Sequence, residues 1–220
     1  GGNSLADERD LVILGFRKIH RNVLFNEHTL ACNNIVRLGY FINGDLLPCR
    51  EDHNLNIPRA AEKALRDPQN WDFRPKPNSE VVDAGRVIQS LDKPDPDTPL
   101  IQAEYLGKAP DIGAYEFGDD FYWIPGRQHP SATTPIPPDG ATNVKPGADL
   151  MFLGGFQADK HIVFFGESHD VTKKQAELKE SNTFSPGRLE PGQTYYWRVD
   201  AVCGGNTING PIWKFSIGTE

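Results

Sequence analysis

Alternating apolar and polar positions mark the strands in the last part of the chain. Between residues 194 and 201, Tyr195 and Trp197 lie on an apolar face and the intervening side chains are mostly polar. Residues 213–217 alternate in the same way, and a period of two is typical of a strand with one buried face. Residues 161–165 are apolar on both faces, which predicts a central strand.

Shorter apolar runs occupy the first half of the chain. They include 11–14, 23–25 and 40–42, and stretches rich in Asn and Gly separate them. Short runs between turn residues read as short strands, and their spacing favours a coiled β architecture over alternating strands and helices. The clearest helix candidate is 58–67, whose Ala and Leu residues form an apolar face and which Pro68 should end.

The composition agrees with a folded, turn-rich, mostly β protein. The 220 residues include 21 Gly and 18 Pro, and 38% of them are hydrophobic. This content argues against a helix bundle and against global disorder. No apolar run approaches the ~20 residues of a membrane span, and the net charge of −7 is a poor match for nucleic acid. We therefore expect neither a membrane span nor a nucleic-acid partner.

The distribution of proline divides the chain. Residues 124–140 contain five Pro and few apolar side chains, a composition typical of a semi-rigid extended spacer. We expect a first domain over 1–117, a Pro-rich linker over 118–135 and a small β-domain over 136–220. The start, Gly1 to Ser4, lacks the basic and apolar regions of a signal peptide. A signal was removed, or the chain begins within a longer protein; we favour the second.

The stretch 189–195 carries the pattern Leu-x-Pro-Gly-x-x-Tyr. It resembles the fibronectin type III domain, in which the Tyr hydroxyl bonds back to the preceding backbone as a tyrosine corner. The resemblance gives that role to Tyr195 and places Trp197 in the core of a β-sandwich. Residues 136–141 and 163–168 resemble the variant found in large secreted bacterial proteins. Such modules usually serve as spacers, so the likeness implies a fold rather than a reaction.

Three motifs in the first domain, at 72–75, 79–85 and 110–116, occur in a recognisable order. They resemble the closing segment of right-handed parallel β-helix proteins of the pectate-lyase-like superfamily. The resemblance covers about 20–117 and implies the last coils and the cap of such a helix. Catalytic residues in that family usually lie on central coils, and none can be mapped onto this sequence.

The residue types in these motifs are also suited to the cap of a coil. Residues 81–85 read as a short buried strand closed by Gly85, and Gly85 and Gly113 suit sharp bends that require a positive φ. Asp83 and Asp111 can accept backbone N–H groups at such corners. A stacked coil needs such an end, because its last turn otherwise exposes an apolar cross-section.

Aromatic and charged residues give a candidate sugar-binding edge. Trp71, Tyr122 and Trp123 have flat rings that can stack on sugars. Arg74 adds a charged hydrogen-bond donor. The alternative is that these rings pack the cap and close the junction between the domains.

Metal and thiol chemistry has little support in the sequence. The acidic loop at 92–99 is a weak candidate for Ca²⁺ and otherwise a solvated loop, and we expect no other cofactor or metal. His161 and His169 are expected to be solvated. Cys32 and Cys49 could close a small disulfide loop, the alternative being two buried thiols.

A basic run from Arg9 to Arg21 includes His20, the one adjacent candidate base for lyase chemistry on an acidic polysaccharide. The alternative, a solvated face of a terminal coil, is favoured.

These features suggest the C-terminal part of a secreted or cell-surface bacterial protein that degrades polysaccharide, as a lyase or a glycoside hydrolase. The chain would cap the β-helix and add a spacer or anchor, without being catalytic itself. Its partners would be the missing N-terminal part of the β-helix or a partner chain, together with polysaccharide. The alternatives are a non-enzymatic adhesion or glycan-binding protein, and one chain of a multi-chain assembly.

Overall fold

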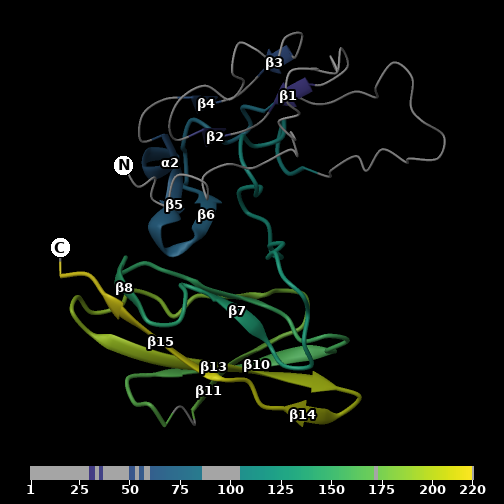
Figure 1. Ribbon diagram of the computed structural model, residues 1–220, viewed down its shortest axis with the longest axis vertical. Coiled ribbons are helices and arrows are strands. Elements are labelled where there is room, and N and C mark those ends of the chain that lie inside the picture. Colours follow the sequence, from purple (N-terminus) through teal and green to yellow (C-terminus); the bar gives the residue numbers. More distant parts are fainter. Residues whose placement is uncertain are drawn as a thin grey trace, which may run out of the picture. The chain divides into compact units, whose positions relative to one another are not determined.

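The computed structural model describes residues 30–32, 35–36, 50–52, 55–56, 60–85, 105–170 and 173–219, with side chains from residue 62 onward. The described chain is almost entirely β-strand and loop, with one short α-helix and one 3₁₀ turn, which confirms the all-β class (Figure 1). It divides into two compact units, residues 1–66 with 73–118, and residues 67–72 with 119–220.

Two pairs of short parallel strands lie in the first unit. β1 (Leu30–Cys32) pairs with β3 (Arg50–Asp52), and β2 (Ile35–Val36) pairs with β4 (Leu55–Asn56). Leu30 lies opposite Arg50 and Ile35 opposite Leu55, so both pairs are offset by 20 residues. In both pairs, the later strand therefore runs parallel to a strand that lies 20 residues earlier in the sequence.

The predicted helix over 58–67 is shorter than expected. Helix α2 covers Ala60–Ala64, and the chain continues directly into β5 (Leu65–Asp67). A 3₁₀ turn, η2 (Pro68–Asn70), then leads into β6 (Asp72–Pro75), which pairs with β5. Pairing with β6 gives the backbone N–H and C=O groups of residues 65–67 hydrogen-bond partners. A further helical turn would not do so as well, because Pro68 would end it.

The second unit consists of two sheets. The larger has the strand order β11-β10-β13-β15-β8 with β14 added to β13, and the smaller has the order β12-β9-β7. All pairs are antiparallel except β15 with β8. The bounds are β7 Thr133–Ile136, β8 Ala141–Val144, β9 Leu150–Leu153, β10 Lys160–Gly166, β11 Lys174–Leu178, β12 Thr183–Phe184, β13 Thr194–Cys203, β14 Asn206–Ile208 and β15 Ile212–Ile217.

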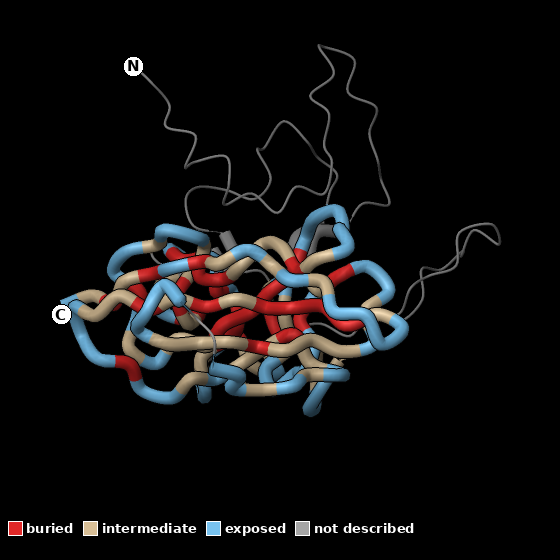
Figure 2. Tube along the Cα trace, turned by 90° about the horizontal axis from the view of Figure 1, so that it is seen from below, coloured by how far each residue is buried: buried red, intermediate tan, exposed pale blue. Residues whose placement is uncertain are grey.

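One hydrophobic core joins both sheets of the second unit. Leu150 and Phe152 of β9 belong to the same buried cluster as Trp197 of β13 and Phe215 of β15. Figure 2 shows the buried segments running through the middle of the strands, with exposed loops around them. The alternation predicted for 194–201 and 213–217 is confirmed on its apolar face, where every member is buried.

Asp200 departs from that alternation, because it is buried although its position was expected to face water. The Arg198 guanidinium binds it at 2.8 and 3.1 Å, and the Gly210 N–H donates to it at 3.0 Å. A buried carboxylate is tolerated where charged and backbone donors satisfy both of its oxygens.

Residues 119–135 of the predicted linker belong to the second unit rather than to a free spacer. Tyr122, Ile124 and Ala132 are buried, and β7 begins at Thr133. The Asn182 side chain explains the difference, because its amide donates to the Tyr122 carbonyl at 2.7 Å and its oxygen accepts from the Tyr122 N–H at 2.9 Å. A side-chain amide can replace a strand partner for an extended, Pro-rich backbone. No helix within the described residues is long and apolar enough to cross a membrane.

Candidate functional site

Three carboxylates organise the end of the first unit. Asp111 is buried and accepts two backbone N–H groups, from Asp83 at 2.7 Å and from Phe117 at 2.6 Å. Glu116 accepts from the N–H of Asp111 at 3.1 Å and from that of Leu106 at 3.3 Å. Each carboxylate therefore ties together irregular segments, because its oxygens supply acceptors for backbone N–H groups that a strand partner would otherwise satisfy.

Asp83 extends this network on the exposed side. Its carboxylate accepts from the N–H groups of Lys108 at 2.6 Å and Ala109 at 3.2 Å, and these two bonds lower its pKa below the ordinary value. Residues 80–83 form turns rather than the predicted strand, and Asp83 has a φ of 57°, a left-handed conformation outside the usual strand range.

The two predicted bend glycines lie beside these acids. Gly113 has a φ of 134°, as predicted. The prediction for Gly85 is wrong, because Gly85 does not adopt a positive φ; its N–H donates to the Pro110 carbonyl at 2.7 Å. Below them Val81 and Ile112 belong to the buried cluster of this unit, and the Ile112 N–H donates to the Val81 carbonyl at 2.9 Å. Among the described residues of this segment, the carboxylates of Asp83, Asp111 and Glu116 all accept backbone N–H groups.

Tyr195 and Trp197 both lie on the buried face of β13. The Tyr195 hydroxyl accepts a hydrogen bond from the Glu190 N–H at 3.1 Å, and the ring stacks on Phe165 with centroids 5.2 Å apart. The Trp197 ring packs against Trp213 at 4.7 Å. Both residues therefore have structural roles.

The candidate sugar-binding residues do not share one environment. Trp123 and Trp71 are exposed, with 71% and 43% of their surface accessible. Arg74 and Tyr122 are buried, at 3% and 6%, so these two are corrected, because their side chains are not available to a sugar in solvent. The backbone of Tyr122 is paired with the Asn182 side chain through two hydrogen bonds.

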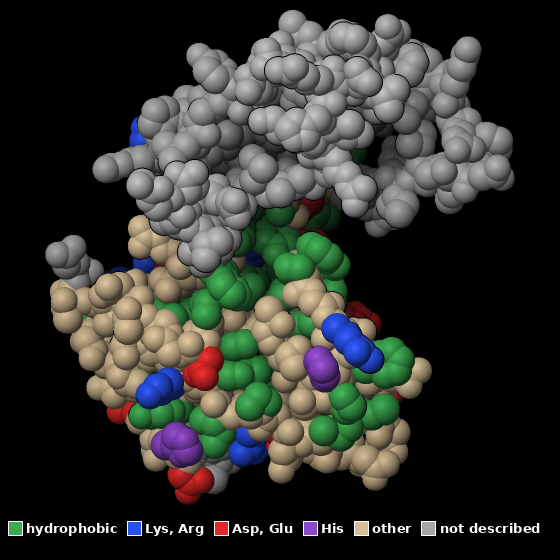
Figure 3. All heavy atoms as spheres, viewed as in Figure 1, with side chains coloured by type: hydrophobic (Ala, Val, Ile, Leu, Met, Phe, Trp, Pro, Cys, Tyr) green, Lys and Arg blue, Asp and Glu red, His purple; other side chains and the backbone are tan. Residues whose placement is uncertain are grey.

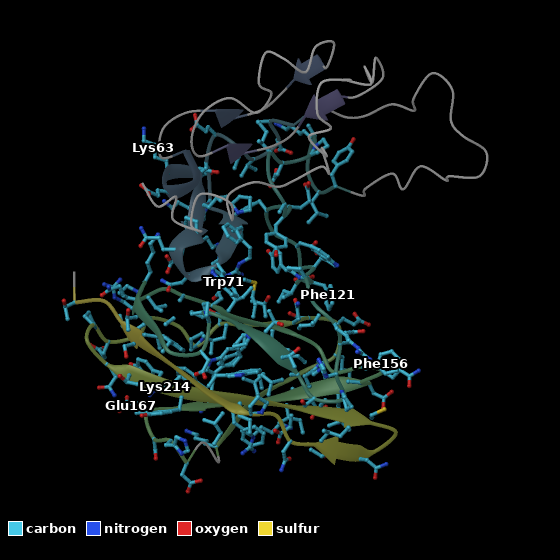
Figure 4. The ribbon with its side chains drawn as sticks, in the orientation of Figure 1. Lys63, Trp71, Phe121, Phe156, Glu167 and Lys214 are labelled. Carbon is cyan, nitrogen blue, oxygen red and sulfur yellow. The ribbon has the colours of Figure 1, made fainter. Side chains whose placement is uncertain are left out.

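A surface hollow of about 590 Å³ lies elsewhere on the second unit, open to solvent. Arg127, Gln128, His129 and Pro130 line it from the segment before β7, and Phe156 lines it from the loop between β9 and β10. Phe156 is 54% exposed, and Figure 4 shows it projecting away from the strands. In Figure 3, basic, His and hydrophobic side chains lie side by side near that edge.

Backbone contacts fix the loop that carries Phe156. The Phe156 N–H donates to the His129 carbonyl at 2.7 Å, which joins the two segments that line the hollow. The Gly155 N–H donates to Nε2 of His161 at 3.0 Å, and burial lowers the pKa of His161. His161 is therefore half-buried and accepts a bond through a neutral ring, and it is not solvated as the sequence suggested.

Gly155 is a position where an added side chain would force its neighbours to shift. An added Cβ would stand 2.7 Å from the Ala201 Cβ and 2.7 Å from the Pro130 carbonyl oxygen. Sequence reasoning missed the hollow, because 127–130 and 156 come together only through the pairing of β7 with β9. The pattern Gly-Gly-Phe at 154–156 was the one local signal of an exposed aromatic on a tight loop.

Several predicted sites lie outside the described residues. They are the Ca²⁺ candidate at 92–99, the basic run from Arg9 to Arg21, Cys49, and the side chain of Cys32, which leaves the disulfide prediction untested. Within the described part, Cys203 is a free thiol, and no group of three or more His, Cys, Asp or Glu is placed to hold a metal.

Comparisons with known proteins return little. No protein-family profile and no curated protein match the chain. A solved structure with some likeness is the β-1,2-glucanase from Parabacteroides distasonis, with a TM-score of 0.32 and 13% sequence identity. The match covers 50% of this chain and 15% of the glucanase chain, and we draw no conclusion on fold or activity from it.

Proposed function

We propose that this chain is a non-catalytic end piece of a secreted or cell-surface protein that acts on polysaccharide. Its first unit would form the last coils and the cap of a right-handed parallel β-helix. Its second unit would be a fibronectin type III-like β-sandwich that spaces or anchors the rest. The 20-residue offset shared by both parallel strand pairs is the observation that carries this proposal.

The offset favours a coil, because a chain that stacks parallel strands at one fixed spacing must turn once per repeat. Repeats of about 20–30 residues are typical of such solenoids. The carboxylate network of Asp83, Asp111 and Glu116 follows these strands in the sequence and orders an irregular segment over the buried Val81 and Ile112. A solenoid requires a terminal structure of this kind to cover its last apolar cross-section.

The proposed sandwich in the second unit rests on separate observations. Two sheets share one core, and β13 carries both the Tyr195 hydroxyl bond to the Glu190 N–H and the central Trp197. That bond has the direction and the sequence separation expected of a tyrosine corner. The assignment to polysaccharide rests on the resemblance of the motifs at 72–75, 79–85 and 110–116.

The proposed lack of catalysis rests on four acids whose carboxylates are already engaged. Asp83, Asp111 and Glu116 all accept backbone N–H groups, and Asp200 is bound by Arg198, so each already has a structural partner. General acid–base chemistry needs a proton-accepting group directed at a substrate.

The direct test is to incubate the full chain with pectate, xylan and β-1,2-glucan and to measure new reducing ends and unsaturated products. We expect neither above the buffer control, even at high protein concentration. Products that co-purify with the chain through two different chromatography steps would overturn the non-catalytic role. The cap and the coil are tested separately, by the exchange and distance measurements given in the Discussion.

A further inference from the structure

We propose that the hollow lined by Arg127, Gln128, His129, Pro130 and Phe156 binds a sugar ring that carries a carboxylate, as in a hexuronate unit of an acidic polysaccharide. This site goes beyond the capping and spacing role. It would give the second unit its own ligand whether or not the first unit is the end of a β-helix.

The aromatic wall of the hollow favours a sugar ring, and its volume leaves room for one. A volume of about 590 Å³ is in the range of sites for small ligands. Phe156 leaves 54% of its surface accessible, and no ring contact within the described residues covers it. A flat exposed ring beside Pro130 offers the apolar platform on which the C–H face of a sugar stacks.

The polar side chains that line the hollow favour a negatively charged ligand. Three of its five residues carry N–H donors, and among the described residues no acidic side chain lines it. Arg127 forms no ion pair within the described part of the chain, so its planar fork remains available to a ligand carboxylate. A guanidinium matches a carboxylate with two parallel hydrogen bonds, which a neutral sugar cannot offer. The hollow therefore favours an anionic ligand on a chain whose net charge is −7.

The two walls are held in place before any ligand arrives. The Phe156 N–H bond to the His129 carbonyl joins them directly, and the Gln128 amide donates to the Gly154 carbonyl at 3.4 Å. Gly155 packs so closely against Ala201 and Pro130 that an added side chain would force them to shift. Preorganisation of this kind lowers the ordering cost of binding.

Isothermal titration of the full chain tests the proposal with three probes: trigalacturonate, a sulfated trisaccharide and neutral maltotriose. We expect binding of trigalacturonate and no measurable binding of maltotriose. Phe156→Ala and Arg127→Ala should each weaken the uronate affinity by about tenfold or more. Arg127→Lys keeps the charge but loses the planar fork, so it should remain clearly weaker than the parent.

Phe121→Ala is the matched control, because Phe121 is an equally exposed aromatic, at 56%, outside the hollow. It should leave the affinity unchanged, and the thermal midpoint of each variant should stay near that of the parent because both rings are exposed. Absence of uronate binding at millimolar concentration would overturn the proposal. Tighter binding of the sulfated probe would overturn the carboxylate assignment, and an equal loss in Phe121→Ala would overturn the location.

Discussion

Replacing Asp111 by Asn tests the proposed cap at its most buried acid. The substitution keeps the shape of the side chain and one carbonyl oxygen, and it converts the other oxygen into an NH₂ donor. Asp111 now accepts from the Asp83 and Phe117 N–H groups at 2.7 and 2.6 Å. In the variant at least one of these N–H groups would face a donor in a site that is only 4% exposed.

The magnitude follows from the loss of one hydrogen bond to a charged acceptor and the weakening of the other. Bonds to charged groups contribute about 1.5–3 kcal/mol each, and an unsatisfied buried donor adds a further cost. We therefore expect a local loss of about 2–4 kcal/mol. At about 1.4 kcal/mol for each factor of ten, the opening of this segment becomes about 30- to 1,000-fold more frequent.

Amide hydrogen exchange of the full chain, measured by NMR, reports this loss at Asp83 and Phe117 themselves. Asp111→Asn should accelerate exchange at these two amides while amides of β13 keep their rates. Asp119→Asn is the control, because the Asp119 carboxylate is exposed and, among the described residues, accepts only from the nearby Phe121 N–H at 3.2 Å. Unchanged exchange at Asp83 and Phe117 in Asp111→Asn would refute the role of the acid in the cap.

Three further predictions concern the second unit. Tyr195→Phe removes the acceptor of the Glu190 N–H and should lower stability by about 1 kcal/mol, or a few degrees in a calorimetric scan; an unchanged midpoint would contradict it. Burial lowers the pKa of His161 below 6.5, so the unfolded chain binds more protons there, and stability should fall as the pH drops below about 6.5 toward the folded pKa. Unfolding scans at about pH 7.5 and about pH 5.5 should show this drop, and His161→Asn should reduce it; an equal drop in the variant would exclude His161 as its source. Gly155→Ala should destabilise the unit by about 1–3 kcal/mol in urea unfolding through its clash with the backbone of Pro130, and a neutral effect would show that the loop adapts.

The parts of the fold that depend on local pattern could be predicted from the sequence. The alternation around Tyr195 and Trp197 placed both on the buried face, because a period of two requires no knowledge of the partner strand. The acids Asp83 and Asp111 were expected to accept backbone N–H groups, and both do. Short polar side chains at bends satisfy nearby donors whatever the surrounding fold is.

The parts that depend on distant partners could not be predicted. The Asp200 carboxylate accepts from the N–H of Gly210, ten residues later, and the Tyr122 backbone pairs with Asn182, 60 residues later. Helix α2 ends early because Leu65 enters a strand pair. The hollow at Phe156 combines two segments about 26 residues apart, a separation that no local pattern reveals.

The parallel coil is the central claim, and inter-strand NOEs of the full chain in solution test it most directly. We predict contacts between backbone protons of Leu30 and Arg50, and between those of Ile35 and Leu55, in the pattern of parallel strands offset by 20 residues. An antiparallel pattern, or pairing of these strands at another offset, would contradict the coil and the capping role built on it.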